Sequence, residues 1–147
     1  FRYLRDELLG STKYTALMWQ LIDDYSVDVE ALTMNLWLQP NDIQILSNKE
    51  HIIGLHSHTH PTDIASLSYN RQLLEYRENS DKITAITGRR PKIAAYPCNS
   101  YNDDSLKVLR SLGVELGFRS NMKYINAGNL LEIPREDHIN IMGQIHV

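Results

Sequence analysis

The residues of this sequence most able to do chemistry are three histidines that alternate with hydroxyl-bearing residues. They are His56, His58 and His60. In an extended backbone the three imidazoles project to one side, and in a coiled backbone His56 and His60 still share a face. Neutral imidazole is a favoured ligand of zinc and similar cations. The pattern therefore predicts a divalent metal site, with zinc as the expected ion and with Ser57 and Thr59 placed to fix the ring tautomers.

The position of this cluster in the chain supports the metal site. It follows an apolar run, residues 52–55, which is typical of a buried strand. In α/β folds the reactive groups gather at the carboxyl ends of strands. The alternative is an exposed polar loop in which histidines recur by chance, because short motifs give false positives. The strand end and the closing Pro61 favour the metal.

The elements that must position the cluster alternate between helices and short strands. Periodicity and capping residues predict helices over 12–25, 28–37, 68–88 and 102–113. A further helix is predicted to begin at Asn41, with Gln44 as its capping partner. Strands are predicted over 52–55, 92–96, 114–118 and 131–133. This alternation indicates an α/β layer or barrel with parallel strands.

Two segments carry a family resemblance. Residues 53–61 read IGLHSHTHP, and residues 95–103 read AYPCNSYND, followed by an LxxLGxxxGF pattern over 106–118. They resemble the second motif, H-[ST]-x-x-H, and the YPxGxYND variant of the third motif of the NodB-like polysaccharide deacetylases, carbohydrate esterase family four. The resemblance covers about residues 41–138. It implies a distorted parallel (β/α) barrel, incomplete at its N-terminus, in one domain over 1–147 with a helical segment 1–40 and a motif-bearing part 41–147.

The resemblance also implies a mechanism. In this family the first and last histidines of the second motif bind a divalent metal together with an aspartate, which implies His56 and His60 as ligands. A metal-activated water attacks the acetamide carbonyl of an N-acetylated sugar or polysaccharide, and a second aspartate is the general base. The backbone amide after the motif's proline, here that of Cys98, donates to the oxyanion.

Further candidate residues lie after two of the predicted strands. Tyr96 and Tyr101 flank the third motif and are expected to contact a sugar ring. Arg135 is expected to bind substrate or orient the site. Asp137 is expected to orient the site and support the catalytic groups, and His138 is expected to donate a proton or add a metal ligand. The alternative for this last segment is a polar loop with a local Arg–Asp pair.

The sequence departs from the family pattern in three ways. The family aspartates come from a first motif of the type TFDDG, which does not occur here, and the pair Asp23 and Asp24 is typical of a solvated helix end. Ala95 stands where the third motif carries an arginine. The late histidine motif has no clear match, and His146 is interpreted as a tail residue. We therefore expect Phe1 to be an internal start, with the third ligand and general base encoded before it.

These departures keep two other hypotheses open. One is a catalytically impaired carbohydrate- or metal-binding module of the same fold. The other is a different metallohydrolase in which another carboxylate completes the site.

Composition excludes several classes of protein. The 147 residues include 15 basic and 18 acidic ones, so no polycationic surface for nucleic acid or membrane is expected. A single cysteine excludes an intrachain disulfide, and no apolar run approaches the roughly 20 residues that span a bilayer. The expected partner is an acetylated carbohydrate. The expected location is the cytoplasm, or outside it if a signal peptide has been removed.

Overall fold

The first part of the chain is helical and has no core of its own. The computed structural model describes residues 1, 3–123, 128–136 and 138–145, in two units, Phe1–Gln39 and Pro40–Val147. In the first unit a π-helical turn, Leu4–Leu9, leads to α1 (Gly10–Asp24) and then to α2 (Val29–Leu36). The carboxylate of Asp28 accepts a hydrogen bond from the Ala31 amide at 2.9 Å and so caps α2. No described side chain of this unit is buried.

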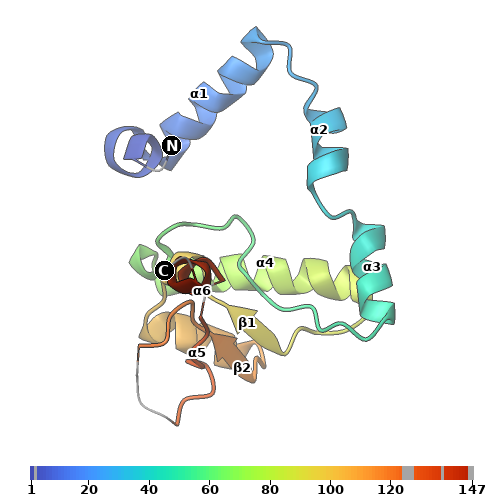
Figure 1. Cartoon of the computed structure of the whole chain (residues 1–147), viewed down its shortest axis with the longest axis vertical. Helices are drawn as coiled ribbons and strands as arrows, with labels where there is room; N and C mark the ends of the chain where they lie inside the picture. The colour runs from blue at the N-terminus through green and yellow to red at the C-terminus, as the bar shows by residue number, and fades with distance from the viewer. Residues whose placement is uncertain (2, 124–127, 137, 146–147) are drawn as a thin grey trace. The chain divides into compact units, whose positions relative to one another are not determined.

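The second unit contains the sheet (Figure 1). Its elements in order are α3 (Pro40–Asn48), α4 (Tyr69–Thr87), β1 (Ile93–Ala95), α5 (Asp103–Ser111), β2 (Leu116–Phe118) and α6 (His138–Ile145), with 3-10 turns at Ile64–Ser66 and Pro97–Asn99. β1 and β2 pair in parallel with Ala94 opposite Gly117. Leu55 bridges Ala94 in parallel, and Phe118 bridges Ile133 in parallel. The prediction of an α/β fold with parallel strands is therefore confirmed.

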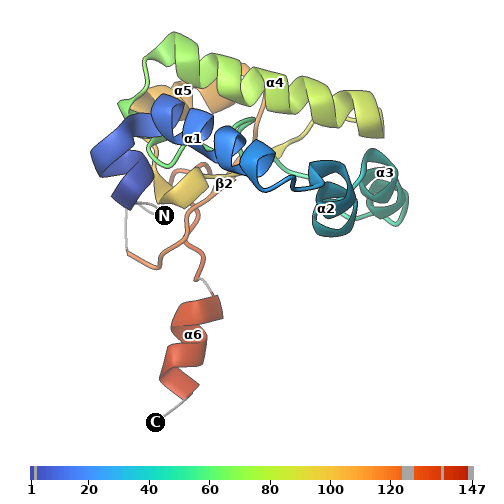
Figure 2. The ribbon, with the colours of Figure 1, turned by 90° about the horizontal axis from the view of Figure 1, so that it is seen from above.

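The core of this unit lies between its helices and its strands. Figure 2 shows α4 and α5 on one side of β1 and β2. The buried apolar side chains come from the helices, from the strands and from the segments that bridge to them: Leu55, Ile64, Tyr76, Ile83, Ala94, Tyr96, Leu106, Val108, Leu109, Val114 and Leu131. Burial of such side chains is the main favourable term for this layer. Among the described residues no helix is both long and apolar enough to cross a membrane.

Close packing requires glycine at one position of β2. A Cβ atom at Gly117 would lie 2.4 Å from the carbonyl oxygen of Leu131 and 2.7 Å from the hydroxyl of Tyr96. Only a residue without a side chain lets the segment at Leu131 approach the strand this closely.

Several element boundaries differ from the sequence-based prediction, among them the strand predicted over 131–133, which is reduced to the bridge at Ile133. The strand predicted over 52–55 is reduced to the bridge at Leu55. α3 begins at Pro40, whose fixed backbone angle suits a first helical turn, so the predicted cap by Asn41 is wrong and Gln44 instead donates to Asn48 at 3.1 Å. β2 begins at Leu116 rather than at Val114.

Candidate active site

The histidine cluster lies where the chain leaves the sheet. The Leu55 amide donates to the carbonyl of Ile93, and the Ala95 amide donates to the carbonyl of Leu55, both at 2.9 Å. These two bonds place His56 beside the carboxyl end of β1. Such an edge is where sites of α/β proteins are found.

The backbone around His56 fixes its tautomer. Its Nδ1 atom lies 2.8 Å from the carbonyl oxygen of Ala95. Because a carbonyl oxygen only accepts hydrogen bonds, Nδ1 carries the proton. The lone pair of Nε2 is therefore available to a metal ion. The amide of His56 donates to Oδ1 of Asn79 in α4 at 3.0 Å, which holds the main chain of the residue as well.

His60 lies next to His56. The two ring centroids are 4.9 Å apart, and the ring planes meet at 61°. The chain reaches this arrangement through left-handed backbone at Ser57 (φ 63°) and His60 (φ 55°), which costs a non-glycine residue on the order of 1 kcal/mol each. The hydroxyl of Ser57 accepts a hydrogen bond from the His60 amide at 3.1 Å and so closes the turn. The two imidazoles are therefore close enough to bind one cation. This fits the pair of histidine ligands predicted for a metal.

Electrostatics favour the ligating form of His56. Burial lowers the pKa of His56, and the neighbouring His60 and Arg135 lower it further, against an opposing contribution from the Ala95 carbonyl. A lowered pKa keeps the ring neutral, and only a neutral imidazole binds a metal.

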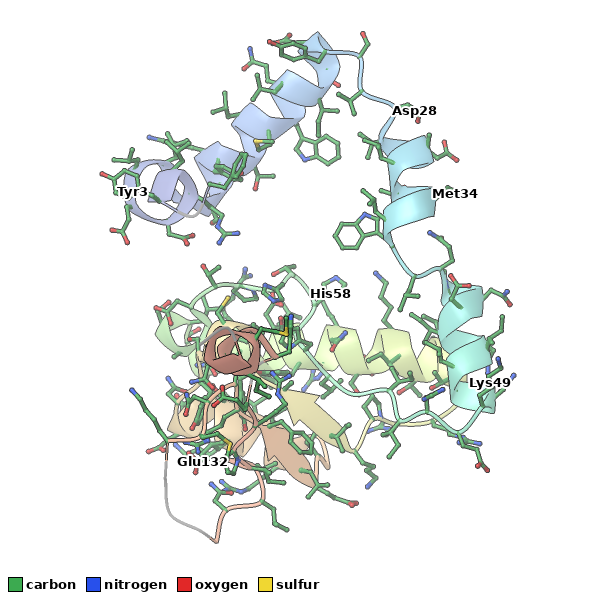
Figure 3. All side chains as sticks on the ribbon, in the orientation of Figure 1. Tyr3, Asp28, Met34, Lys49, His58 and Glu132 are labelled. Atoms are coloured by element: carbon green, nitrogen blue, oxygen red, sulfur yellow. The ribbon has the colours of Figure 1, made fainter. Side chains whose placement is uncertain are left out.

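His58 is separate from this pair. Its Nε2 atom lies 3.6 Å from Oε2 of Glu78 in α4, and Figure 3 labels the ring on the loop that passes this helix. Its amide and that of Thr59 donate to Oε2 of Glu75, at 3.0 Å and 2.8 Å. The resemblance implies only His56 and His60 as ligands, and the structure likewise separates His58 from that pair.

The third motif follows β1 as a tight turn. Cys98 (φ 50°) and Asn99 (φ 58°) both adopt left-handed backbone, and Asn99 stands where the motif carries glycine. Asparagine tolerates this conformation better than most residues. Its Oδ1 accepts a hydrogen bond from the Ser120 amide at 2.8 Å, which ties the turn to the segment after β2. The Cys98 amide thus lies three residues after Ala95, whose carbonyl holds His56.

The tyrosine at position 96 is a core residue. Only 3% of its surface is exposed, and its hydroxyl donates to the Leu131 carbonyl at 2.5 Å. Its ring stacks on that of Tyr101 with centroids 4.2 Å apart. This burial counts against contact between Tyr96 and a sugar ring, which stays a prediction. Tyr101 is half-buried and donates to Glu132 at 2.9 Å (Glu132 is labelled in Figure 3), and sugar contact by Tyr101 stays a prediction.

The segment after residue 133 contributes one residue to the surroundings of the histidines. Nε of Arg135 donates to the Arg119 carbonyl at 3.1 Å, and the positive charge of Arg135 is the smallest of the causes that lower the pKa of His56. Asp137 lies outside the described residues, as does His146. His138 begins α6 and is exposed.

The described part of the chain holds no group of three or more His, Cys, Asp or Glu side chains able to share a metal ion. A role of His138 as a further ligand or proton donor stays a prediction. Asp23 and Asp24 lie exposed at the end of α1, as expected of a solvated helix end.

Sequence reasoning missed the residues of α4 that hold the histidine loop. Glu75 and Asn79 are spaced four apart and lie on one face of the helix. The only signal in the sequence was that pair of polar residues within a partly apolar helix, and many solvated helices carry such a pair.

Comparison with known proteins identifies the family and the fold. The family model described as polysaccharide deacetylase matches residues 10–117. The chain is similar to the structure of Streptococcus pyogenes deacetylase PplD in complex with acetate, at 25% identity and a TM-score of 0.61, over 67% of this chain and 44% of that chain. A search of curated proteins gave no match.

Two further solved structures share the fold. A de-N-acetylase from Aggregatibacter actinomycetemcomitans has 16% identity and a TM-score of 0.58, over 69% of this chain and 48% of that one. The polysaccharide deacetylase BC0361 from Bacillus cereus has 18% identity and a TM-score of 0.57, over 67% of this chain and 32% of that one. The chain thus spans less than half the length of each of these three structures. With the family match over most of its residues and this shared parallel α/β arrangement, the chain belongs to the polysaccharide deacetylase family and forms part of its (β/α) barrel.

Proposed function

We propose that this chain carries the metal-binding histidines of a hydrolase that removes acetyl groups from N-acetylated sugars or polysaccharides. The observation that supports the proposal best is the pairing of His56 and His60, 4.9 Å apart, with Nε2 of His56 left as a lone-pair donor. A divalent ion, zinc by preference for imidazole, would be held by these two rings. Its further ligands come from outside the pair.

The roles of the chain's own groups follow from their places. A bound divalent ion would supply Lewis acidity and a lowered pKa for water. The Ala95 carbonyl keeps the His56 ring oriented, and the Cys98 amide on the next turn is a candidate donor to the oxyanion that forms at the acetamide carbon. Arg135 adds positive charge beside the histidines, which favours anionic groups such as the released acetate. PplD was solved in complex with acetate.

Metal content and acetate release together test this proposal. The purified protein is loaded with Zn²⁺, desalted and analysed for zinc, and acetate release from N-acetylated chito-oligosaccharides is then measured. We expect zinc to be retained and to be lost in His56→Ala and in His60→Ala, and any acetate release to be lost with it. A protein that retains no zinc, cobalt or nickel at saturating metal would refute the metal site.

A second candidate function is a carbohydrate- or metal-binding module without catalysis. It is favoured by the described residues holding two clustered histidines and no third ligand, and by Ala95 in the place of the motif arginine. Retained zinc and retained binding of the oligosaccharide without acetate release would decide for this module.

A further inference from the structure

One face of α4 is committed to the loop that carries the histidines. Three of its residues reach that loop: Glu75, Glu78 and Asn79. Glu75 and Asn79 are one helical turn apart, and both bind backbone groups rather than side chains of histidine. The helix therefore holds the backbone of the loop as well as contacting the His58 side chain.

Glu75 makes the densest set of these contacts. Its Oε2 atom accepts from the amides of His58 and Thr59, at 3.0 Å and 2.8 Å, and its Oε1 atom accepts from the Thr59 hydroxyl at 2.6 Å. Both carboxylate oxygens are thus directed at two consecutive residues midway between His56 and His60. Hydrogen bonds to a charged acceptor are shorter and stronger than those between neutral groups.

The backbone of the loop is not held by any helix or strand of its own. Ser57 and His60 are both left-handed, so the chain between them belongs to no helix or strand. His58 and Thr59 are exposed, so without Glu75 their amides would donate to water, and the loop would lose these bonds to α4. Ser57, which is buried, closes the turn through the His60 amide from the other side.

We propose that Glu75 is a positioning residue that holds the 56–60 loop in the shape that brings His56 and His60 onto one metal ion. This inference rests on the proposed metal site. Glu78 serves as its internal contrast, because it lies on the same helix and near the same loop but contacts only the His58 ring, at 3.6 Å.

Titration with Co²⁺, followed by its visible absorption, tests the proposal with matched variants. Glu75→Met keeps an unbranched chain of similar length and good helix propensity but removes both acceptors. Glu75→Gln keeps an acceptor for the two amides, and its NH₂ group can donate to the Thr59 hydroxyl. Glu78→Met makes the same chemical change one turn along the helix. Far-UV circular dichroism and thermal unfolding report whether each variant is folded.

We expect Glu75→Met to bind Co²⁺ at least about tenfold more weakly than the unsubstituted protein, as is usual when the support of a ligand is removed. Glu75→Gln and Glu78→Met should bind within about twofold of it, with the same absorption envelope. Equal binding by Glu75→Met overturns the proposal while leaving the metal site intact. Loss of affinity of equal size in Glu75→Gln also overturns it, because the carboxylate would then act through its charge.

Two outcomes distinguish a failure of the role proposed for Glu75 from a failure of the proposed metal site. If the unsubstituted protein binds no Co²⁺, the metal site itself fails, and the role of Glu75 falls with it. If Glu75→Met does not fold, Thr59→Val decides, since it removes one of the three contacts with little change in shape. Weaker Co²⁺ binding by Thr59→Val supports the proposal, and unchanged binding overturns it.

Discussion

His56 is a better candidate ligand than its sequence motif alone would make it. The carbonyl of Ala95 fixes its protonated nitrogen, and burial lowers its pKa, so the ring is neutral and oriented before any ion arrives. Preorganisation of this kind reduces the ordering that metal binding would otherwise require. The sequence motif gives only the residue type, whereas the Ala95 carbonyl determines which nitrogen of His56 can bind a metal.

The three histidines should therefore differ in their response to substitution. We expect His56→Ala and His60→Ala each to weaken Zn²⁺ binding by about tenfold or more, because each removes a ring of the pair. His58→Ala should leave binding within about twofold, since this ring lies beside Glu78. Isothermal titration with Zn²⁺ checks this, and equal losses in all three variants would contradict the assignment.

The buried tyrosines make stability sensitive to alkali. Burial raises the pKa of both Tyr76 and Tyr96 far above that of a free phenol. In the unfolded chain these phenols ionise near pH 10, but in the folded protein they stay neutral. Unfolding therefore releases protons above pH 10, and the free energy of unfolding should fall there by about 1.4 kcal/mol per pH unit for each such tyrosine.

Urea unfolding at pH 8, 10 and 11 measures this slope. Tyr96→Phe is the control: it should lower the free energy of unfolding by about 1 kcal/mol at pH 8, because the Leu131 carbonyl loses its donor. It should also make the decline above pH 10 shallower. An unchanged slope in Tyr96→Phe would mean that Tyr96 ionises in the folded state.

At the scale of elements, local chemistry was predictable and pairing between distant segments was not. The start of α5 followed from Asn102, whose side chain forms a reciprocal capping box with Ser105, three residues away. The run 52–55 was read as a strand, but how much of it pairs depends on β1, some 40 residues on, and only Leu55 does so. The periodicity of a segment does not specify the length of its partner.

The candidate site divides in the same way. The pairing of His56 and His60 was predictable because both residues belong to one five-residue pattern. The roles of Glu75 and Asn79, and the burial of Tyr96, depend on contacts with residues 16 to 35 positions away. No local pattern encodes contacts of that range.

β2 offers a test of the close packing between elements. Gly117→Ala should destabilise the protein by about 1–3 kcal/mol or more, because the new methyl group meets the Leu131 carbonyl, which is backbone and cannot rotate away. Gly143→Ala in α6 is the matched control, since nothing lies within 4 Å of its Cβ position. Alanine is also the better helix former there. Thermal unfolding of both variants decides, and equal melting temperatures would contradict the packing argument.

At the scale of the whole chain, burial is confined to one of the two units. All buried apolar side chains of the described residues lie after Gln39. In the first unit large apolar side chains are exposed, among them Trp37 at 67% and Leu38 at 66%. Exposed segments between helices are the preferred sites of proteolysis.

Limited digestion with chymotrypsin should follow this division. We expect cleavage after Trp37 well before cleavage after Tyr76 or Tyr96, which are 0% and 3% exposed. Mass spectrometry of early time points identifies the products, and a fragment starting near residue 38 should accumulate. Cleavage at Tyr96 as early as at Trp37 would show that the core opens as readily as the segment between α2 and α3.

The anchoring of the histidine loop also sets an order of events during synthesis. The contacts described above that hold the loop from outside come from residues that follow it, namely Glu75, Glu78, Asn79 and Ala95. At about 5–20 residues per second, the ribosome delivers these partners some seconds after the histidines themselves. For that interval the imidazoles emerge without the carbonyl that selects their tautomer and without the carboxylate that bends their backbone. The nascent chain thus acquires the candidate ligands His56 and His60 early, and the shape of their loop only once β1 has been made.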